Sequence, residues 1–553
     1  MTQMNTSKYS ILIVLACLIF FSCRKEENII VQDLYAIDKS RTYTENESEN
    51  RIKEQVWFYY KYLSLWEENI YPKAEDFDLM ETTGYIRENF TNYFQTASDV
   101  LDYLMGLTRR TTKGYTMTSS FPGENPFRFY KKLKRTTTAE KGDYDRYTYF
   151  DRGGFISGAV GSSPYRESMG MNLLYLQNED NSNKYLYVAY VEKHSPAYRA
   201  GIRRGARILK LNDDANIDYN YQSDNQFYQL ESYLHSNSLK VEYRSKEGEV
   251  RVAQLQYSNS ITDVVYKDTV VTVDGIKIGY LGFSSFLRKN AWVLDGEVQK
   301  TFLTRIHEVF NNFSSQNIDE LVVDLRYNGG GYIDMQEEIA NFMVPQQASG
   351  QLMNTYKINR YLKSEGKDEP GEDFAPVYFN KRGALNLSRV YFLVSEETAS
   401  ASELLINVLV PYMKVYMIGT YAMENGKAVA QNTYGKPVGF FGVPILSSSN
   451  QLYVASFQMF NKDGFGDYFH GLVPQHHVWP YQYFYDFADP RESLFAAAIA
   501  HMQTGNFPST VSRSIKEGRE AFNPKDYTPV FGNRYFPMMI KETEKPLRSL
   551  QNQ

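Results

Sequence analysis

The chain has 553 residues, with 60 Lys and Arg against 65 Asp and Glu, and a formal net charge of −5. Its length exceeds what one hydrophobic core organises and predicts several domains. The balanced charge, with no basic stripe interleaved with aromatic residues, argues against nucleic acid as a partner. Both cysteines, Cys17 and Cys23, lie near the N-terminus, so disulfides, zinc-thiolate sites and a cysteine nucleophile are excluded for a chain that begins at Cys23.

The first residues have the pattern of a secretory signal. Lys8 precedes an apolar run, Ile11–Phe21, that is short for a membrane span, and Ser22-Cys23 follows. This ending resembles a bacterial lipobox, so we expect residues 1–22 to be a lipoprotein signal peptide and Cys23 to carry the lipid. An uncleaved anchor helix is the alternative. Residues 23–50 are polar and predict a tether. The Arg-Lys-Glu-Glu sequence after Cys23 resembles the charged export tags of surface lipoproteins in Bacteroidetes-type bacteria. This resemblance implies a lipid-anchored protein in the cell envelope of a Gram-negative bacterium.

The folded part begins with a predicted helical domain over residues 51–150. Apolar residues recur at helical spacing from Val56 to Trp66 and from Val100 to Met105. The pattern then changes to a β-rich region over residues 151–260.

Three segments of this β-rich region resemble a PDZ domain. They are a strand at Leu186–Val191, a short helix at Ser195–Ile202 and a strand at Gly205–Asn212. In PDZ domains an extended peptide adds to a sheet edge, and a glycine-containing loop holds its C-terminal carboxylate. The corresponding loop here contains Met169, Gly170 and Met171, and the alternative is an ordinary hairpin turn.

Alternating strands and helices over residues 261–502 predict an α/β domain. One strand, Glu320–Leu325, leads into the glycine run Gly329–Gly331, and a helix-like stretch covers residues 298–313. The tail, residues 503–553, is mixed, and its sequence predicts no role.

The segment Thr398–Glu403 joins the apolar strand Val390–Val394 to an apolar helix. A serine at such a strand-to-helix turn lies where free amide groups and the helix dipole favour developing negative charge. An acyl-transfer nucleophile needs that environment. A simple Ser/Thr helix cap is the alternative.

Three motifs occur in order after the PDZ-like region: Gly279–Phe283, Asp324–Gly331 and Ser400–Glu403. Together they resemble the C-terminal processing (tail-specific) serine protease family. The resemblance implies a multidomain α/β fold with a crotonase/ClpP-like protease core, polypeptide substrates, and neither cofactor nor metal. It implies Ser400 as the nucleophile, with Ser402 as the alternative, and the amides of Gly330 and Ala401 as the oxyanion hole.

Family members use a lysine as the general base, and two lysines follow the nucleophile. Asn425-Gly426 is a hairpin-turn signal, which predicts that Lys427 lies at the tip of an inserted hairpin. Lys436 lies in a compact, apolar-flanked segment and is therefore favoured. Lys427 remains the alternative, because Gln431 follows it at the spacing of a lysine-orienting glutamine in some members.

Other functions stay open from the sequence. A protease scaffold that only binds peptides would keep the same motifs, and the α/β core is also related to crotonase-like acyl-CoA enzymes. His476-His477 could suggest a Ser/His pair or a metal site, but neighbouring residues on a strand face opposite ways, so surface or packing roles are favoured.

Overall fold

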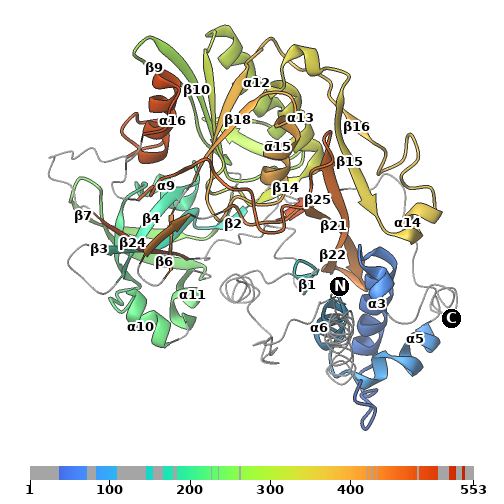
Figure 1. Ribbon diagram of the computed structural model, residues 1–553. Helices are drawn as coiled ribbons and strands as arrows, with labels where there is room; N and C mark the ends of the chain where they lie inside the picture. Colours follow the sequence, from blue (N-terminus) through green and yellow to red (C-terminus); the bar gives the residue numbers. More distant parts are fainter. Residues whose placement is uncertain are drawn as a thin grey trace, which may run out of the picture. The chain divides into compact units, whose positions relative to one another are not determined.

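The computed structural model is shown in Figure 1. It describes residues 37–70, 83–108, 145–152, 166–178, 184–260 without 226 and 235, 263–481 without 420, 425, 426 and 431, 485–508, 522–530 and 538–541. These residues fall into two compact units. The first ends at Phe150, and the second runs from Asp151 onward and also includes Leu63–Leu65.

The first unit is helical, as expected. Its α-helices are α3 (Glu47–Leu63), α5 (Thr83–Asn89) and α6 (Ala97–Leu107), with 3-10 turns η2 (Glu67–Asn69) and η4 (Thr91–Tyr93). The tether was expected to reach residue 50, but α3 begins earlier. The Asn46 side chain accepts a hydrogen bond from the Glu49 amide at 3.1 Å, and Glu47 and Glu49 place negative charge in the first turn. A cap and an acidic first turn favour a helix where polarity alone indicated a tether.

The second unit contains the β-rich region expected to resemble a PDZ domain. Six strands form one sheet in the order β24-β3-β4-β5-β6-β7, with three short helices beside it, and β2 pairs with β8 in a separate ribbon. The sheet strands are β3 (Met171–Asn178), β4 (Lys184–Val191), β5 (Arg207–Leu211), β6 (Ser238–Arg244), β7 (Val250–Gln256) and β24 (Phe522–Val530). The ribbon strands and helices are β2 (Arg166–Ser168), β8 (Ser258–Ser260), α9 (Pro196–Arg199), α10 (Tyr219–Asp224) and α11 (Tyr228–Leu234).

Strand β3 separates two hydrophobic cores. Leu173 and Tyr175 belong to the core of the β-rich region itself, whereas Leu174 and Leu176 belong to a core shared with the α/β domain. Successive side chains of a strand point to opposite faces, so one strand supplies both cores. This shared burial explains why the two regions form a single compact unit.

The α/β domain is built on a six-stranded sheet in the order β23-β18-β17-β13-β10-β9. Its strands are parallel except β9, which pairs antiparallel with β10. They are β9 (Val265–Val273), β10 (Ile276–Phe283), β13 (Glu320–Asp324), β17 (Arg389–Leu393), β18 (Lys414–Gly419) and β23 (His476–His477). The helices of this domain are α12 (Phe302–Ser315), α13 (Ile333–Met343), α14 (Arg360–Ser364), α15 (Ala401–Leu409) and α16 (Ser493–Thr504), and a 3-10 turn η5 (Gln346–Ala348) follows α13.

The helix expected over residues 298–313 is partly wrong. Val298–Thr301 is strand β12, which pairs with β11 (Trp292–Asp295), and α12 begins only at Phe302. The Thr301 side chain accepts a hydrogen bond from the Thr304 amide, which caps the helix at that point.

A second sheet has the order β14-β25-β21-β22-β15-β16, and β1 (Tyr149–Arg152) also pairs with β22. Its strands are β14 (Gly330–Tyr332), β15 (Leu352–Ile358), β16 (Val377–Tyr378), β21 (Val438–Ile445), β22 (Ser447–Asn461) and β25 (Met538–Ile540). A separate hairpin joins β19 (Tyr421–Glu424) to β20 (Lys427–Ala430).

The tail beyond residue 502 therefore supplies one strand to each of two sheets, β24 and β25. The glycine run and the Ser400 turn meet because β13 and β17 are parallel neighbours. Adjacent parallel strands present their carboxyl ends at the same sheet edge, where open α/β sheets bind ligands.

Candidate active site

Ser400 lies at the turn between β17 and α15, as the sequence predicted. Its backbone has φ 64° and ψ −115°, a conformation that costs a non-glycine residue about 1–3 kcal/mol and that clusters at functional sites. The side chain is buried, and its Oγ has no hydrogen-bond partner among the described residues. A buried hydroxyl without a partner among the described residues, on a strained turn, fits the nucleophile that the sequence predicts.

Ser402, the alternative nucleophile, is bonded differently. Its Oγ donates to the Asn328 carbonyl oxygen at 3.0 Å, and the Ala399 amide donates to the same oxygen at 3.2 Å. These bonds join the start of α15 to the loop after β13. The amide of Ala401 lies in the first turn of α15, where amides have no intrahelical acceptor.

The glycine run forms a strand that approaches its neighbours closely. Gly331 has φ +140°, and a Cβ there would lie 2.1 Å from the Phe286 carbonyl oxygen, so only glycine fits. The Phe286 amide donates to the Gly330 carbonyl at 2.9 Å. The Gly330 amide, predicted to form the oxyanion hole, donates to Asn328 Oδ1 at 2.9 Å in this structure.

Glu403 joins the serine turn to the lysine segment. One oxygen of this buried carboxylate accepts from the amides of Ser400 and Lys436, each at 2.8 Å. The other accepts from the Gly435 amide at 2.7 Å and from the Thr433 hydroxyl. Burial raises the pKa of Glu403, and these four donations oppose that rise. The carboxylate therefore acts as a fixed acceptor that sets the distance between two segments of the chain.

The two candidate lysines lie in different surroundings. Lys436 is fully buried, and its Nζ lies 3.8 Å from the centroid of the Phe440 ring. Lys427 is the first residue of β20 and pairs with Glu424 across the hairpin turn, as the Asn-Gly signal predicted. Gln431, its suggested orienting partner, lies outside the described residues. Lys436 therefore lies in the apolar surroundings that its flanking sequence predicted.

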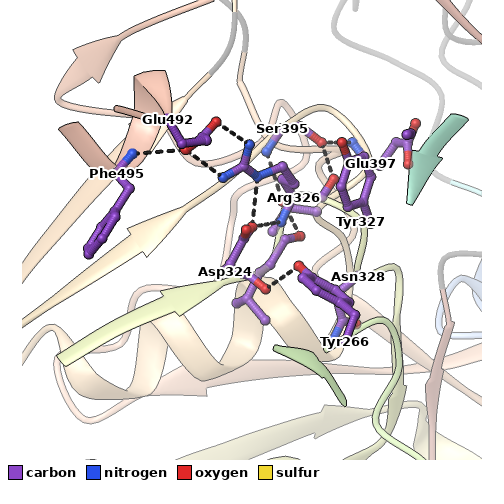
Figure 2. Close-up of polar contacts among 12 residues, drawn as sticks. Tyr266, Asp324, Arg326, Tyr327, Asn328, Ser395, Glu397, Glu492 and Phe495 are labelled. Carbon is purple, nitrogen blue, oxygen red and sulfur yellow. Dashed lines mark hydrogen bonds and ion pairs between the residues drawn. The ribbon is translucent and has the colours of Figure 1, made fainter. Parts of the chain in front are cut away.

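Beneath the site lies a buried ionic network, shown in Figure 2. The Arg326 guanidinium donates to Asp324 Oδ1 at 2.9 Å and to both oxygens of Glu492, at 2.7 and 3.1 Å. The Tyr280 hydroxyl donates to the second Asp324 oxygen at 2.6 Å. All four side chains are buried, so each charge in the network depends on the others.

The network holds both loops of the site. Arg326 lies two residues before Asn328, and its carbonyl oxygen accepts from the Ser395 hydroxyl in the loop that leads to Ser400. Glu492 also caps α16 by accepting from the Phe495 amide at 3.0 Å. Burial would raise the pKa of Glu492, but the Arg326 guanidinium holds that pKa below its usual range.

The β-rich region contacts the same loop through Arg204. This buried side chain donates to the Tyr327 hydroxyl at 2.9 Å and to the Ala189 carbonyl at 2.6 Å, and it lies over the Phe487 ring. Tyr327 stands between Arg326 and Asn328 in sequence. Arg204 therefore connects the β-rich region to the loop that carries the glycine strand.

Met169, Gly170 and Met171 lie apart from this cluster, at the start of β3. Gly170 has φ +76°, and a Cβ there would lie 2.0 Å from the Cβ of Ser195. Met169 and Met171 are buried. Cys23 and the rest of the expected signal peptide lie outside the described residues.

His476 packs against an aromatic side chain. Its ring stacks on Phe507 with centroids 4.8 Å apart. No group of three or more His, Cys, Asp or Glu that could hold a metal ion occurs among the described residues. Across the same residues, no helix is long and apolar enough to cross a membrane.

Sequence reasoning missed two contributors to the site. Asn328 lies within the motif Asp324–Gly331, but its contact with Ser402, 74 residues away along the chain, depends on tertiary structure. Glu492 carried no signal at all, because its partner Arg326 is 166 residues away along the chain.

Comparison with known proteins agrees with this geometry. Residues 277–471 match peptidase family S41. This part of the chain is an S41 peptidase domain. The match covers the glycine strand, the Ser400 turn and the Lys436 segment, and it favours a peptidase over the acyl-CoA enzyme considered from the sequence.

Two curated relatives of the S41 domain are carboxyl-terminal-processing enzymes. The chain is 23% identical over 358 residues to carboxyl-terminal-processing peptidase 3, chloroplastic, of Arabidopsis thaliana. It is 27% identical over 247 residues to the carboxyl-terminal-processing protease of a Picosynechococcus species. The alignments cover 63% and 44% of this chain, and they span 60% and 51% of the relatives' lengths.

The fold of the S41 domain and its neighbours also matches a solved structure. An S41 protease from Bacteroides fragilis aligns with a TM-score of 0.56 at 20% identity, over 82% of this chain and 97% of that one. This likeness shows the mixed α/β multidomain fold.

We predict that Glu492→Ala destabilises the S41 domain by about 3 kcal/mol, because it removes a partner of a buried guanidinium. The midpoint of urea unfolding measures the change. Glu249→Ala is the matched control, since the Glu249–Arg251 pair is exposed and its loss costs little. Equal midpoints for the two variants would contradict a structural role for the network.

Proposed function

We propose that this protein is an extracytoplasmic serine endopeptidase in which Ser400 is the nucleophile and Lys436 the general base. The observation that carries the proposal is that Glu403 binds both the Ser400 turn and the Lys436 segment. Its carboxylate holds the strained turn of Ser400, whose hydroxyl has no partner among the described residues, against the segment of the buried Lys436. A weak nucleophile and a base held together by a third group form the recurring arrangement of nucleophilic catalysis.

In this mechanism Ser400 Oγ attacks the carbonyl carbon of the scissile peptide bond while its proton passes to neutral Lys436. The tetrahedral intermediate collapses to an acyl-enzyme, and Lys436 gives the proton to the departing amine. A water molecule then attacks the ester, with its proton taken by Lys436, and releases the second product with Ser400 restored.

The oxyanion would lie at the N-terminus of α15, against the Ala401 amide, with Gly330 as the second donor. Because the Gly330 amide donates to Asn328 Oδ1 in this structure, that amide has to exchange its acceptor when substrate binds. The occupied amide also favours the rival function, a catalytically inactive peptide-binding protein on the same scaffold. Fluorophosphonate labelling of Ser400 separates the two, since only an active serine reacts.

The β-rich region would present polypeptides to this site as a PDZ-like domain. Gly170 and its neighbours precede β3, in the position of the loop that holds a peptide carboxylate in such domains. Arg204 provides a direct connection from this region to the loop before the glycine strand.

Ser400→Ala is expected to abolish hydrolysis of an unfolded protein substrate and leave the melting temperature nearly unchanged, because the missing hydroxyl has no partner. Ser402→Ala should retain fluorophosphonate labelling and lose about 1 kcal/mol of stability, since its hydrogen bond is buried. Labelling that disappears in Ser402→Ala and persists in Ser400→Ala would assign the nucleophile to Ser402.

Lys436→Met should remove activity as completely as Ser400→Ala, because a nucleophile and its base act as one unit. Lys427→Met should retain activity, since Lys427 lies at the turn of a hairpin. Hydrolysis should increase toward alkaline pH, because only a neutral lysine accepts a proton. The opposite ranking of the two variants in initial rate would move the base to Lys427.

We also propose that lipid on Cys23 holds the protein on the cell envelope. The support is the short apolar run after Lys8 and the small residue before Cys23. Cys23→Ala should therefore lose incorporation of radiolabelled palmitate and change membrane partitioning, while the initial rate of the peptidase stays the same. An unlabelled variant that remains membrane-integral with residues 1–22 attached would indicate an uncleaved anchor instead.

A further inference from the structure

The tail of the chain occupies a particular edge of the PDZ-like sheet. Strand β24, Phe522–Val530, pairs antiparallel with β3, and without it β3 would be the edge strand. In Figure 1 the brown β24 lies among the green strands of that sheet. An edge strand presents unpaired amide and carbonyl groups that can pair with one further strand at a time.

This edge is the one to which a peptide would add. β3 begins at Met171, directly after Gly170, so a peptide whose C-terminal carboxylate lay near Gly170 would run antiparallel to β3. β24 has the same direction, because its last residue, Val530, lies opposite Leu173 and its first, Phe522, lies opposite Asn178. The tail therefore has the place and the polarity of a bound ligand.

A helical segment lies beside β3 in this region. Tyr175 of β3 makes an edge-to-face contact with Tyr219 of α10, with ring centroids 5.5 Å apart, and also contacts Phe227. Its hydroxyl donates to the Ile217 carbonyl at 2.9 Å. The side chain of Tyr175 thus packs against the segment that carries α10.

β24 is an imperfect partner for β3. It contains Pro524 and Pro529, which have no amide hydrogen to donate, and Pro529 lies opposite Leu174. The register is also irregular between Phe522 and Tyr527. A peptide with a complete set of amides would pair more fully, so it can compete with β24 for the edge.

The same tail is anchored beside the catalytic cluster. β25, Met538–Ile540, pairs with β14 at Gly330–Tyr332 and with β21 at Phe440. Met539 and Ile540 are buried. This anchor keeps β24 at a high effective concentration near the edge of β3.

We propose that β24 is an internal occupant of the peptide-binding edge, and that a polypeptide substrate adds to β3 by displacing it. The inference rests on the proposed function, because it takes β3 as the edge that captures substrate. Occupation by the tail lowers the apparent affinity for peptides by the fraction of molecules whose edge is free.

The test measures peptide binding in a Ser400→Ala background, where hydrolysis does not interfere. The probe is a short fluorescein-labelled, unstructured peptide with an apolar C-terminal residue and a free carboxylate, and its C-terminal amide is the control ligand. In the released variant, residues 522–530 are replaced by a Gly/Ser linker of equal length, which leaves β25 in place. In the locked variant, Asn178→Cys and Phe522→Cys introduce cysteines at two positions that are partners in the β3–β24 ladder, and Cys17 and Cys23 are replaced by serine.

The released variant should bind the peptide at least about tenfold more tightly than the parent chain, because its edge is always free. The oxidised locked variant should lose binding and recover it on reduction, while each single-cysteine variant should respond to neither treatment. Equal affinity in the parent, released and locked forms would overturn the proposal, as would absence of binding to the released form. These outcomes do not depend on catalysis, so failed hydrolysis by the unmodified protein would overturn the peptidase proposal alone.

Discussion

The arrangement of the candidate site depends on the buried carboxylate of Glu403. It accepts hydrogen bonds from the amides of Ser400, Gly435 and Lys436 and from the Thr433 hydroxyl. A buried carboxylate is stable only when its oxygens accept hydrogen bonds, and one of its donors here, Lys436, lies 33 residues from Glu403 along the chain. The need to satisfy one charge thus fixes the nucleophile turn relative to the lysine segment. It also supports the strained backbone of Ser400, which isolated sequence preferences disfavour.

A second buried charge, the Arg326 guanidinium, fixes the loop between β13 and the glycine strand. Asp324 is the last residue of β13, and Glu492 caps the start of α16. Arg326 lies in the loop after β13, two residues before Asn328 along the chain. Removal of either acid would leave the buried Arg326 guanidinium with one anionic partner and with donors that lack an acceptor, so the network resists local rearrangement. The glycine strand therefore starts from a rigid loop, and its approach to Phe286 is possible because Gly331 has no Cβ.

Two contacts join the β-rich region to the α/β domain within the second unit. Arg204 bonds to Tyr327, the neighbour of Arg326, while the tail contributes β24 to one sheet and β25 to the other. Displacement of β24 would therefore act on a segment whose next strand borders Gly330. Under the proposed function, the tail that carries β24 and β25 would therefore contact both the strand that captures substrate and the glycine strand of the oxyanion hole.

The sequence alone determined the features that depend on neighbouring residues. The strand-to-helix turn at Ser400, the glycine run and the hairpin that carries Lys427 all follow from local chemistry, such as the preference of Asn-Gly for a tight turn. Only the tertiary structure decided which groups those segments meet. The bonds from Ser402 to Asn328, from Arg326 to Glu492 and from β24 to β3 join distant residues. Strand pairing uses backbone groups that every residue carries, so no sequence pattern marked Phe522–Val530 as the occupant of that edge.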